Sequence, residues 1–294
     1  MESAHQKSSP GKLKQYATFF KLRLASLVVF SACLGYLFAN YQPERMATDL
    51  IWLSIGGFLI TGASNGLNQI LERQLDARMN RTSGRPLPMG DMQVNEAWIV
   101  AVISGILGFL ALYLGINAVS AYLALSALIS YAFIYTPLKQ KSAFSVFIGA
   151  FPGAVPPMLG WVAASNSFGA GAGILFAVQF MWQFPHFWAI AWVLDDDYSL
   201  GGFRLLPSAE GRHKSSAFQI LMYTLFTVPV SLLPWAFDLS GFVSLIAALI
   251  MGAYFCYYAF RLYFSCQTSD AKKLMFASFV YLPVLQIIYV IDKL

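Results

Sequence analysis

The sequence predicts an all-α membrane protein built as a bundle of about nine transmembrane helices. Composition is the first observation behind this prediction. Of the 294 residues, 58% are hydrophobic and only 11% are charged, whereas about a quarter of a typical soluble domain is charged. Apolar runs close to the ~20 residues needed to cross a bilayer also recur along the whole chain. The alternating ten-residue segments typical of a membrane β-barrel are absent.

Nine apolar segments are long enough to cross the membrane. We expect one integral-membrane domain over residues 1–294, in which residues 1–23 form a polar, basic N-terminal segment. The expected spans, with boundaries good to a few residues, are 24–41, 51–72, 97–115, 118–136, 144–163, 172–194, 216–236, 240–262 and 273–291.

Basic residues cluster on one side of these predicted spans. With the N-terminus inside, all of the 19 Lys and Arg residues except Arg45 and Lys293 fall in inner segments. This bias is typical of cytoplasmic loops, and an odd number of spans then places the C-terminus outside. We therefore expect a multi-pass protein of the cytoplasmic (inner) membrane. The net charge of +5 is interpreted as topology and attraction to anionic lipid, so no nucleic-acid partner is expected.

The stretch NQILERQLDARMNRTSGRPLPMG, residues 68–90, is unusually polar for the end of an apolar span. If the helix continues one or two turns past Leu71, then Asn68, Glu72 and Asp76 lie at positions i, i+4 and i+8. Each step of four advances only about 40° beyond a full turn and rises about 6 Å, so the three side chains share one face. Oxygen ligands of this kind hold Mg²⁺ while it keeps waters and binds substrate phosphates.

Four arginines crowd the same segment: Arg73, Arg78, Arg81 and Arg85. The simpler interpretation is a solvated helix end whose acids and arginines pair with one another. Four guanidinium groups beside two acids are better explained if a strongly anionic third party, such as a diphosphate, joins them.

A second acidic run, Asp195 to Asp197, ends the sixth predicted span on the same side of the membrane. Three successive acids cannot share one helix face, so at most two are expected to point at one site. A solvated loop is the simpler interpretation of this run alone. Two acidic helix ends on one face of a bundle favour a shared cation site.

His186 is the one histidine inside a predicted span. An ionisable residue at membrane depth is a candidate functional residue, although a hydrogen-bonded histidine in the core is the simpler alternative. Pro185 is expected to kink this span, and Pro156 and Pro157 are expected to break the preceding one.

Acidic clusters, arginines and the inner-loop residues Lys139 and Lys141 at one face of an apolar bundle suggest an enzyme that acts on an amphipathic diphosphate. Mg²⁺ would make the diphosphate a better leaving group. Departure of diphosphate from an allylic chain leaves a carbocation, which requires a dry, aromatic-lined pocket. The active site is therefore predicted at the cytoplasmic face.

Three segments resemble the protoheme IX farnesyltransferases of the UbiA-type intramembrane prenyltransferase superfamily, whose members have nine transmembrane helices. These segments are MNRTSGRPLPMG at 79–90, YTPLK…GAVPPMLGW at 135–161 and WQFPHFWA…DDDY…GG…LLP at 182–207, and Asn68-x3-Glu72-x3-Asp76 resembles the superfamily's first acidic motif. The resemblance covers nearly all of the spans. It implies farnesyl diphosphate as donor, haem B as acceptor, and haem O as product after water addition.

The resemblance also implies roles for individual residues. Asn68, Glu72 and Asp76 would hold Mg²⁺ and diphosphate, and Asp196 and Asp197 would supply a second acidic side. His186 would bind the haem iron or lie near the reacting vinyl group. The expected diphosphate-binding residues are Lys21, Arg23, Arg81, Arg85 and Lys139.

The sequence departs from the family pattern at four positions, of which Ser145 replaces an expected asparagine and Leu22 a common proline. Glu72 stands where many relatives have Asp, and Asp195 stands where a basic residue is expected. The resemblance leaves open whether a haem A synthase or a haem–copper oxidase docks on this protein.

Two alternative functions differ from this one. A quinone- or chlorophyll-type prenyltransferase would carry a more regular aspartate repeat in place of Pro185–Phe187. A cation-coupled transporter would place its ionisable residues near the membrane midplane, often with internal repeats. Here the acids gather at one face, which favours the enzyme.

Overall fold

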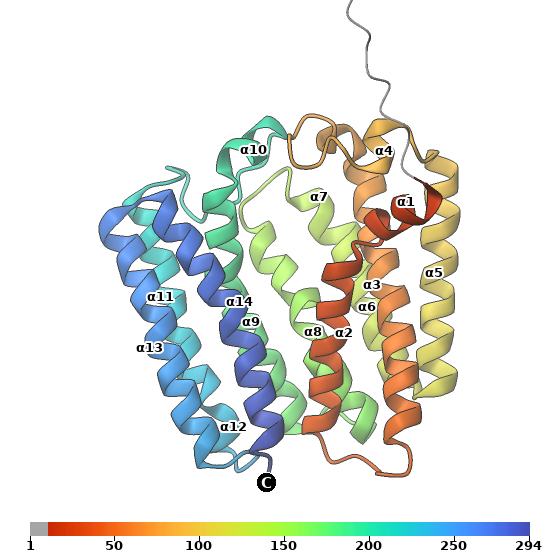
Figure 1. The fold of residues 1–294 in the computed structure, drawn as a ribbon, viewed down its shortest axis with the longest axis vertical. Coiled ribbons are helices and arrows are strands. Elements are labelled where there is room, and N and C mark those ends of the chain that lie inside the picture. Colours follow the sequence, from red (N-terminus) through yellow and green to blue (C-terminus); the bar gives the residue numbers. More distant parts are fainter. Residues whose placement is uncertain (1–10) are drawn as a thin grey trace, which may run out of the picture.

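The computed structural model describes residues 11–294, and this part of the chain is a helical bundle (Figure 1). Eight of its helices are long and apolar enough to cross a membrane, or nine if a bent pair at the N-terminal end counts as one span. The chain is therefore a multi-pass membrane protein, as predicted. The helices are α1 (Lys12–Phe19), α2 (Leu22–Phe38), α3 (Met46–Asp76), α4 (Pro86–Met89), α5 (Val94–Gly115), α6 (Ala118–Ile129), the π-helical turn η1 (Ser130–Tyr135), α7 (Thr136–Leu138), α8 (Ser145–Ser165), α9 (Gly169–Val193), α10 (Asp195–Leu200), α11 (Lys214–Ser231), α12 (Leu233–Ala236), α13 (Phe242–Ser265) and α14 (Thr268–Ile291).

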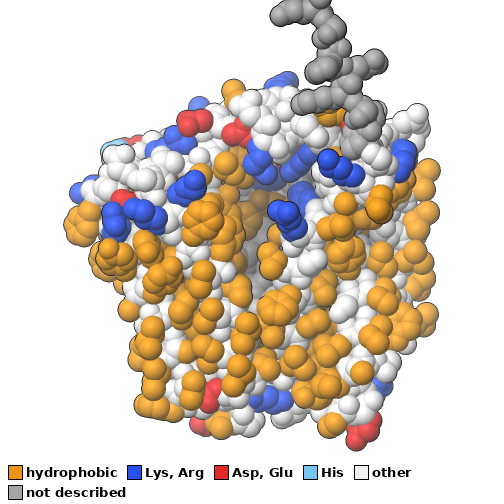
Figure 2. Space-filling model, in the orientation of Figure 1, with side chains coloured by type: hydrophobic (Ala, Val, Ile, Leu, Met, Phe, Trp, Pro, Cys, Tyr) orange, Lys and Arg blue, Asp and Glu red, His pale blue; other side chains and the backbone are white. Residues whose placement is uncertain are grey.

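The side chains divide this bundle into an apolar band and two polar ends (Figure 2). One end, which we call the loop face, is formed by residues 77–93, 139–144 and 194–213 and carries α4 and α10 (Figure 1). Of the expected N-terminal basic segment, residues 1–10 lie outside the described part of the chain.

The first expected span, 24–41, corresponds to α2, which is a continuous helix over Leu22–Phe38. A short helix, α1, precedes α2 and meets it at an angle of 50°. Lys21 occupies the break in a left-handed conformation, with φ 50° and ψ 58°. Helix α3 is longer than the expected 51–72, because its 31 residues run on to Asp76. At 1.5 Å per residue it is about 46 Å long, which exceeds the ~30 Å hydrocarbon core and carries its C-terminal turns to the loop face.

Proline does not break α8, contrary to the expectation for Pro156 and Pro157 from the sequence. Pro157 lies inside α8 and Pro185 inside α9, and both helices are continuous. A proline leaves the carbonyl four residues earlier without its helical donor. In α8 a neighbouring helix supplies the donor: Gln179 Nε2 of α9 donates to Gly153 O at 2.8 Å. Thr227 Oγ1 lies 3.3 Å from Met181 O, but its single hydrogen is directed to Tyr223 O, at 2.8 Å, in its own helix.

Helices α2 and α8 approach closely at glycine. A Cβ atom on Gly160 would lie 1.8 Å from Ala32 O, and one on Gly35 would lie 2.0 Å from Pro157 O. Small residues at such positions let membrane helices pack backbone to backbone. This contact fixes α2 against the centre of the bundle.

Candidate active site at the loop face

The C-terminal turns of α3 present three polar side chains on one buried face. Asn68, Glu72 and Asp76 are 2%, 3% and 1% exposed, respectively. Asn68 Nδ2 donates to Glu72 Oε2 at 2.8 Å, as expected for neighbours at i and i+4. The helical extension and the shared face that were predicted from the spacing are therefore present.

Each group on this face has a basic partner. Lys139 Nζ lies 2.6 Å from Glu72 Oε1, and Arg85 Nη1 lies 2.6 Å from Asp76 Oδ2. Lys21 Nζ donates to Asn68 Oδ1 over a longer 3.4 Å. Three basic side chains thus surround two buried carboxylates, an arrangement that can also attract an anion.

The bend between α1 and α2 brings Lys21 to this site. Gln69 Nε2 donates to Phe19 O (2.6 Å), and Asn65 Nδ2 donates to Phe20 O (3.2 Å). Both donors belong to α3, so the same helix that carries Asn68 holds the last carbonyls before Lys21. A polar pattern on α3 therefore fixes the position of a basic residue on a different element.

Lys139 is held by aromatic rings as well as by Glu72. Its ammonium lies 5.1 Å from the Tyr135 ring centre and 5.4 Å from that of Phe203. Both distances are within the range of cation–π attraction. Tyr135 ends the π-helical turn η1, and Thr136 after it accepts a hydrogen bond from Asn68 Nδ2 at 3.1 Å. Nothing in the sequence marks Thr136 as a partner of Asn68, because the π turn that directs it is a tertiary feature.

The side chains of the three successive acids on α10 do not all point at one site. Asp197 accepts the backbone N–H groups of Asn80 (2.7 Å) and Arg81 (3.4 Å). Asp196 turns the other way: its side chain is 89% exposed and pairs with Arg212 Nη1 at 3.0 Å. Asp195 lies 3.8 Å from Arg212 Nε, and burial raises the pKa of its carboxyl group. Of the two acids expected at the second acidic side, only Asp197 faces the 77–85 segment.

The other expected anion ligands lie farther out. Arg81 is exposed, with its guanidinium 5.7 Å from the Tyr198 ring centre. Arg23 is exposed and makes no ion pair with any residue in 11–294. Arg73 donates to the carbonyl of Ile70 in its own helix. The structure therefore brings Lys21, Arg85 and Lys139 to the acids and leaves Arg23 and Arg81 at the surface.

His186 lies on a different wall of the bundle. Its ring stacks on Trp182 (4.3 Å between centres, 18° between planes) and meets the edge of Phe279 at 5.1 Å. Nδ1 lies 2.7 Å from Ser278 Oγ. Ser278 and Trp182 are contacts that sequence reasoning did not identify.

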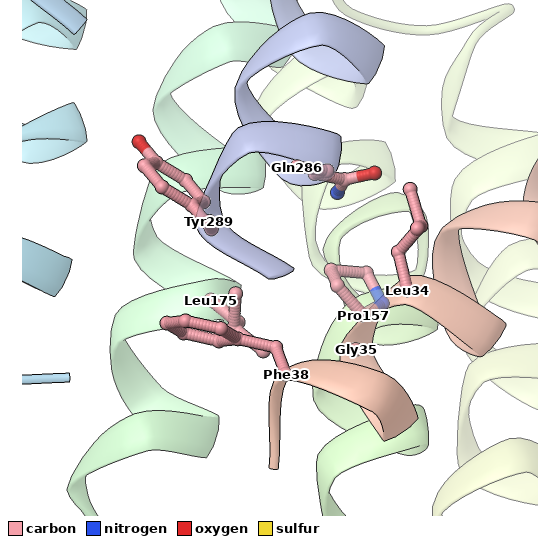
Figure 3. A pocket seen from close by; sticks show the side chains of 7 residues that line it. All are labelled: Leu34, Gly35, Phe38, Pro157, Leu175, Gln286 and Tyr289. Carbon is pink, nitrogen blue, oxygen red and sulfur yellow. The ribbon is translucent and has the colours of Figure 1, made fainter. Parts of the chain in front are cut away.

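A buried hydrogen-bond network joins α9, α14 and α2 near the middle of the bundle. Gln179 on α9, Gln286 on α14 and Ser31 on α2 share hydrogen bonds of 3.0 to 3.1 Å. Figure 3 shows Gln286 beside Leu34 of α2, above a gap with no space for a water molecule. The three helices are therefore closely packed at the level of these three side chains.

Above the network the helices separate. His186 lies seven residues after Gln179 on α9, and Phe279 lies seven residues before Gln286 on the antiparallel α14. Seven residues make nearly two turns, so both rings lie on the same sides as the glutamines, about 10 Å nearer the loop face. Figure 2 shows a hollow here between α2 and α14, with Lys and Arg side chains at its upper end. The hollow thus has a basic rim, and helical periodicity places His186 and Phe279 on the same sides of α9 and α14 as the glutamines that contact α2.

The oxygen donors on α3 suit a hard divalent cation. Glu72 Oε1 is buried and, although Lys139 is near, has no donor in hydrogen-bonding geometry. In residues 11–294, no three His, Cys, Asp or Glu side chains converge as a metal cage. A metal held here would therefore share its coordination with water and substrate oxygens, which is the usual mode of Mg²⁺.

Comparison with known proteins relates this architecture to a family. The model of the UbiA prenyltransferase family matches residues 28–281. A protoheme IX farnesyltransferase from Cytophaga hutchinsonii is 47% identical, covering 95% of this chain and 99% of its own. One from Christiangramia forsetii is 48% identical, covering 96% of this chain and 94% of its own.

Solved structures agree in fold. A structure from work on digeranylgeranylglyceryl phosphate synthase has a TM-score of 0.77 at 19% identity, covering 96% of this chain and 98% of its own. A UbiA homologue from Archaeoglobus fulgidus bound to DMAPP and Mg²⁺ has a TM-score of 0.62 at 14% identity, with 94% and 99% covered. The chain belongs to the UbiA prenyltransferase family, as the resemblance of its motifs predicted.

Proposed function

We propose that this chain transfers the farnesyl group of farnesyl diphosphate to a vinyl group of haem B, with addition of water, to give haem O and diphosphate. The observation that carries the donor half is the buried row Asn68, Glu72 and Asp76 with Lys21, Lys139 and Arg85 around it. The acceptor is proposed from the name of the relatives that match nearly the whole chain.

The diphosphate is bound by the residues that are already close together. Lys21, Lys139 and Arg85 bind its oxygens by charge-assisted hydrogen bonds. Asn68, Glu72 and Asp76 would hold Mg²⁺, which when bound neutralises the diphosphate and improves it as a leaving group. Asp197 holds the backbone of Asn80 and Arg81, and so positions the segment that carries Arg85.

The transfer itself breaks the bond between farnesyl C1 and the diphosphate oxygen. The vinyl π electrons of haem B form the new carbon–carbon bond to C1, and water adds to the resulting cation beside the ring and loses a proton. The hollow between α2 and α14 keeps bulk water away until the vinyl group attacks. His186, held between Trp182 and Phe279, would bind the haem iron and so orient the porphyrin.

We also propose the orientation in the membrane. The loop face is cytoplasmic, the N-terminus lies in the cytoplasm and the C-terminus lies outside the cytoplasmic (inner) membrane, because the basic residues gather at that face. A haem A synthase or a haem–copper oxidase is the class of partner expected to take up haem O.

Mass analysis of haem tests this function. Purified protein is incubated with haem B, farnesyl diphosphate and Mg²⁺, and the extracted haem is compared with that from the Asp76→Asn variant. We expect a product heavier by one farnesyl group plus water, formed by the unmodified chain and not by the variant. Unchanged haem from a folded protein that prenylates a quinone instead would overturn the acceptor and retain the donor site.

A further inference from the structure

Ser278 and Trp182 hold the His186 ring from two directions. The Trp182 indole stacks on the ring, and its Nε1 donates to the backbone carbonyl of Ser278 at 3.0 Å. The hydroxyl of the same serine lies 2.7 Å from His186 Nδ1. Ser278 is completely buried. The ring plane and one ring nitrogen are therefore fixed by a single pair of neighbours.

The hydrogen-bond donors around Ser278 determine which ring nitrogen carries the proton. Ser278 Oγ donates its only hydrogen to Met275 O, at 2.6 Å, in the preceding turn of α14. A hydroxyl has one donor and two acceptor positions. Since its proton is used, Ser278 Oγ accepts from His186, and Nδ1 must carry a hydrogen.

The other nitrogen, Nε2, is left without a protein partner. Within residues 11–294, His186 makes no second hydrogen bond through its ring, and no carboxylate pairs with it. An unpaired imidazolium at membrane depth is costly, so the ring is neutral and Nε2 carries a lone pair. His186 is partly exposed, and with no protein partner for Nε2 in residues 11–294 that lone pair is free to bind a ligand.

We propose that Ser278 is a positioning residue for the porphyrin substrate: it fixes the Nδ1–H tautomer of His186, so that Nε2 is the nitrogen that binds the ring metal. This inference rests on the proposed function for the identity of the ligand. In metal sites a ligating histidine almost always donates its other N–H to a partner that sets its tautomer and orientation. Here Ser278, whose hydroxyl hydrogen is donated to Met275 O, accepts the Nδ1–H of His186 and sets its tautomer.

Nitrogen-15 NMR tests the tautomer without any substrate. With His5→Gln and His213→Gln, His186 is the only histidine in the chain. Its protonated and bare nitrogens have well-separated shifts, and only the protonated one shows one-bond coupling to hydrogen. We expect Nδ1–H in this background, and a shift of about fivefold toward Nε2–H in Ser278→Ala, the effect of losing one hydrogen bond.

Ser126→Ala is the matched control. Ser126 also donates to the carbonyl three residues before it, Leu123 O at 2.7 Å, but it is exposed and contacts no histidine. We expect its tautomer spectrum to equal that of the background. A bare Nδ1 in the background, or an unchanged tautomer in Ser278→Ala, would overturn the inference.

Titration with haem B separates this inference from the proposed function. We expect Ser278→Ala to bind haem B about 10- to 100-fold more weakly, with His186→Ala at least as weak and Ser126→Ala unchanged. Loss of binding in His186→Ala without any effect of Ser278→Ala would reject the role of Ser278 and keep His186 as ligand. Equal binding by all variants, together with the expected tautomer, would reject haem ligation while Ser278 still sets the proton.

Discussion

Lys139 Nζ lies 2.6 Å from Glu72 Oε1, and both side chains are largely buried. Asp76 has the same relationship with Arg85. Before substrate arrives, each carboxylate of the proposed metal site is thus neutralised by a residue proposed to bind diphosphate. Binding of metal and diphosphate therefore requires an exchange of partners, in which the bases move to phosphate as the acids are taken over by the metal.

This exchange predicts that Mg²⁺ and diphosphate bind together. In Lys139→Met, Glu72 has lost its competing cation, so Mg²⁺ alone is expected to bind more tightly than to the unmodified chain. A non-reactive thio analogue of farnesyl diphosphate is expected to bind about 30-fold more weakly, as for a truncated partner of a buried pair. Isothermal titration calorimetry measures both affinities.

Lys141→Met is the control for that change. Lys141 is exposed, two residues further along the same segment, and forms no ion pair with any residue of the described part, 11–294. Its replacement should leave both affinities unchanged. If Lys139→Met weakened the binding of both Mg²⁺ and the analogue, the proposed exchange of partners between Glu72 and the diphosphate would be wrong.

The acids of α10 should separate in their effects on turnover. Asp197→Ala removes the acceptor for two backbone N–H groups of the 77–85 segment, so we expect haem O formation to fall by about 10-fold or more, as for other residues that orient metal or substrate ligands. Asp196→Ala removes an exposed partner of Arg212 and should change the rate by less than about twofold. Comparable losses in the two variants would show that Asp196 reaches the site in the working enzyme.

Asp76→Ala should stop turnover while the protein remains folded. Asp76 is 1% exposed, and its removal takes away one proposed metal oxygen and leaves Arg85 unpaired. We expect haem O formation to fall at least about 100-fold. Circular dichroism and thermal unfolding in detergent check the fold, and full activity in a folded variant would be incompatible with the proposed metal site.

The contact between α2 and α8 should be intolerant of a single methyl group. In Gly160→Ala the new Cβ would lie 1.8 Å from Ala32 O, a backbone atom that cannot turn aside. We expect a loss of about 1–3 kcal/mol in the free energy of unfolding, measured by denaturant titration in mixed micelles.

Gly173→Ala makes the same change inside α9, where no atom lies within 4 Å of the added Cβ. That variant should be as stable as the unmodified chain or slightly more so. Equal destabilisation of both variants would point to helix geometry rather than to the α2–α8 contact.

Local periodicity was sufficient to predict the spans and the row on α3. Asn68, Glu72 and Asp76 are brought to one face by helix geometry alone, so their spacing was informative. The pairing of Asp196 with Arg212 could not be predicted from local periodicity. Asp195, Asp196 and Asp197 are identical in type, and only the orientation of the short helix α10 decides which partner each side chain reaches. The contact of Ser278 with His186 joins residues 92 positions apart, and only the packing of α14 on α9 creates it.

The prolines show a second limit of sequence reasoning. Pro156 and Pro157 were expected to break their span, and this expectation follows from the chain segment considered alone. Inside the bundle, Gln179 donates to the carbonyl of Gly153, which Pro157 leaves without its helical donor, and α8 continues. This donor comes from another helix, α9, which no rule about local sequence includes.

The hydrogen bond from Gln179 to Gly153 O also constrains the order in which this chain can evolve. While Pro157 is present, Gln179→Leu leaves a carbonyl bare inside the membrane. Once Pro157 is replaced by a residue with an N–H group, that N–H donates to Gly153 O within α8. A hydrogen-bond donor at position 179 is then no longer needed for this carbonyl. The two positions are therefore epistatic. Replacing Pro157 first and Gln179 second keeps Gly153 O hydrogen-bonded throughout, whereas the reverse order passes through a variant in which this carbonyl has no donor.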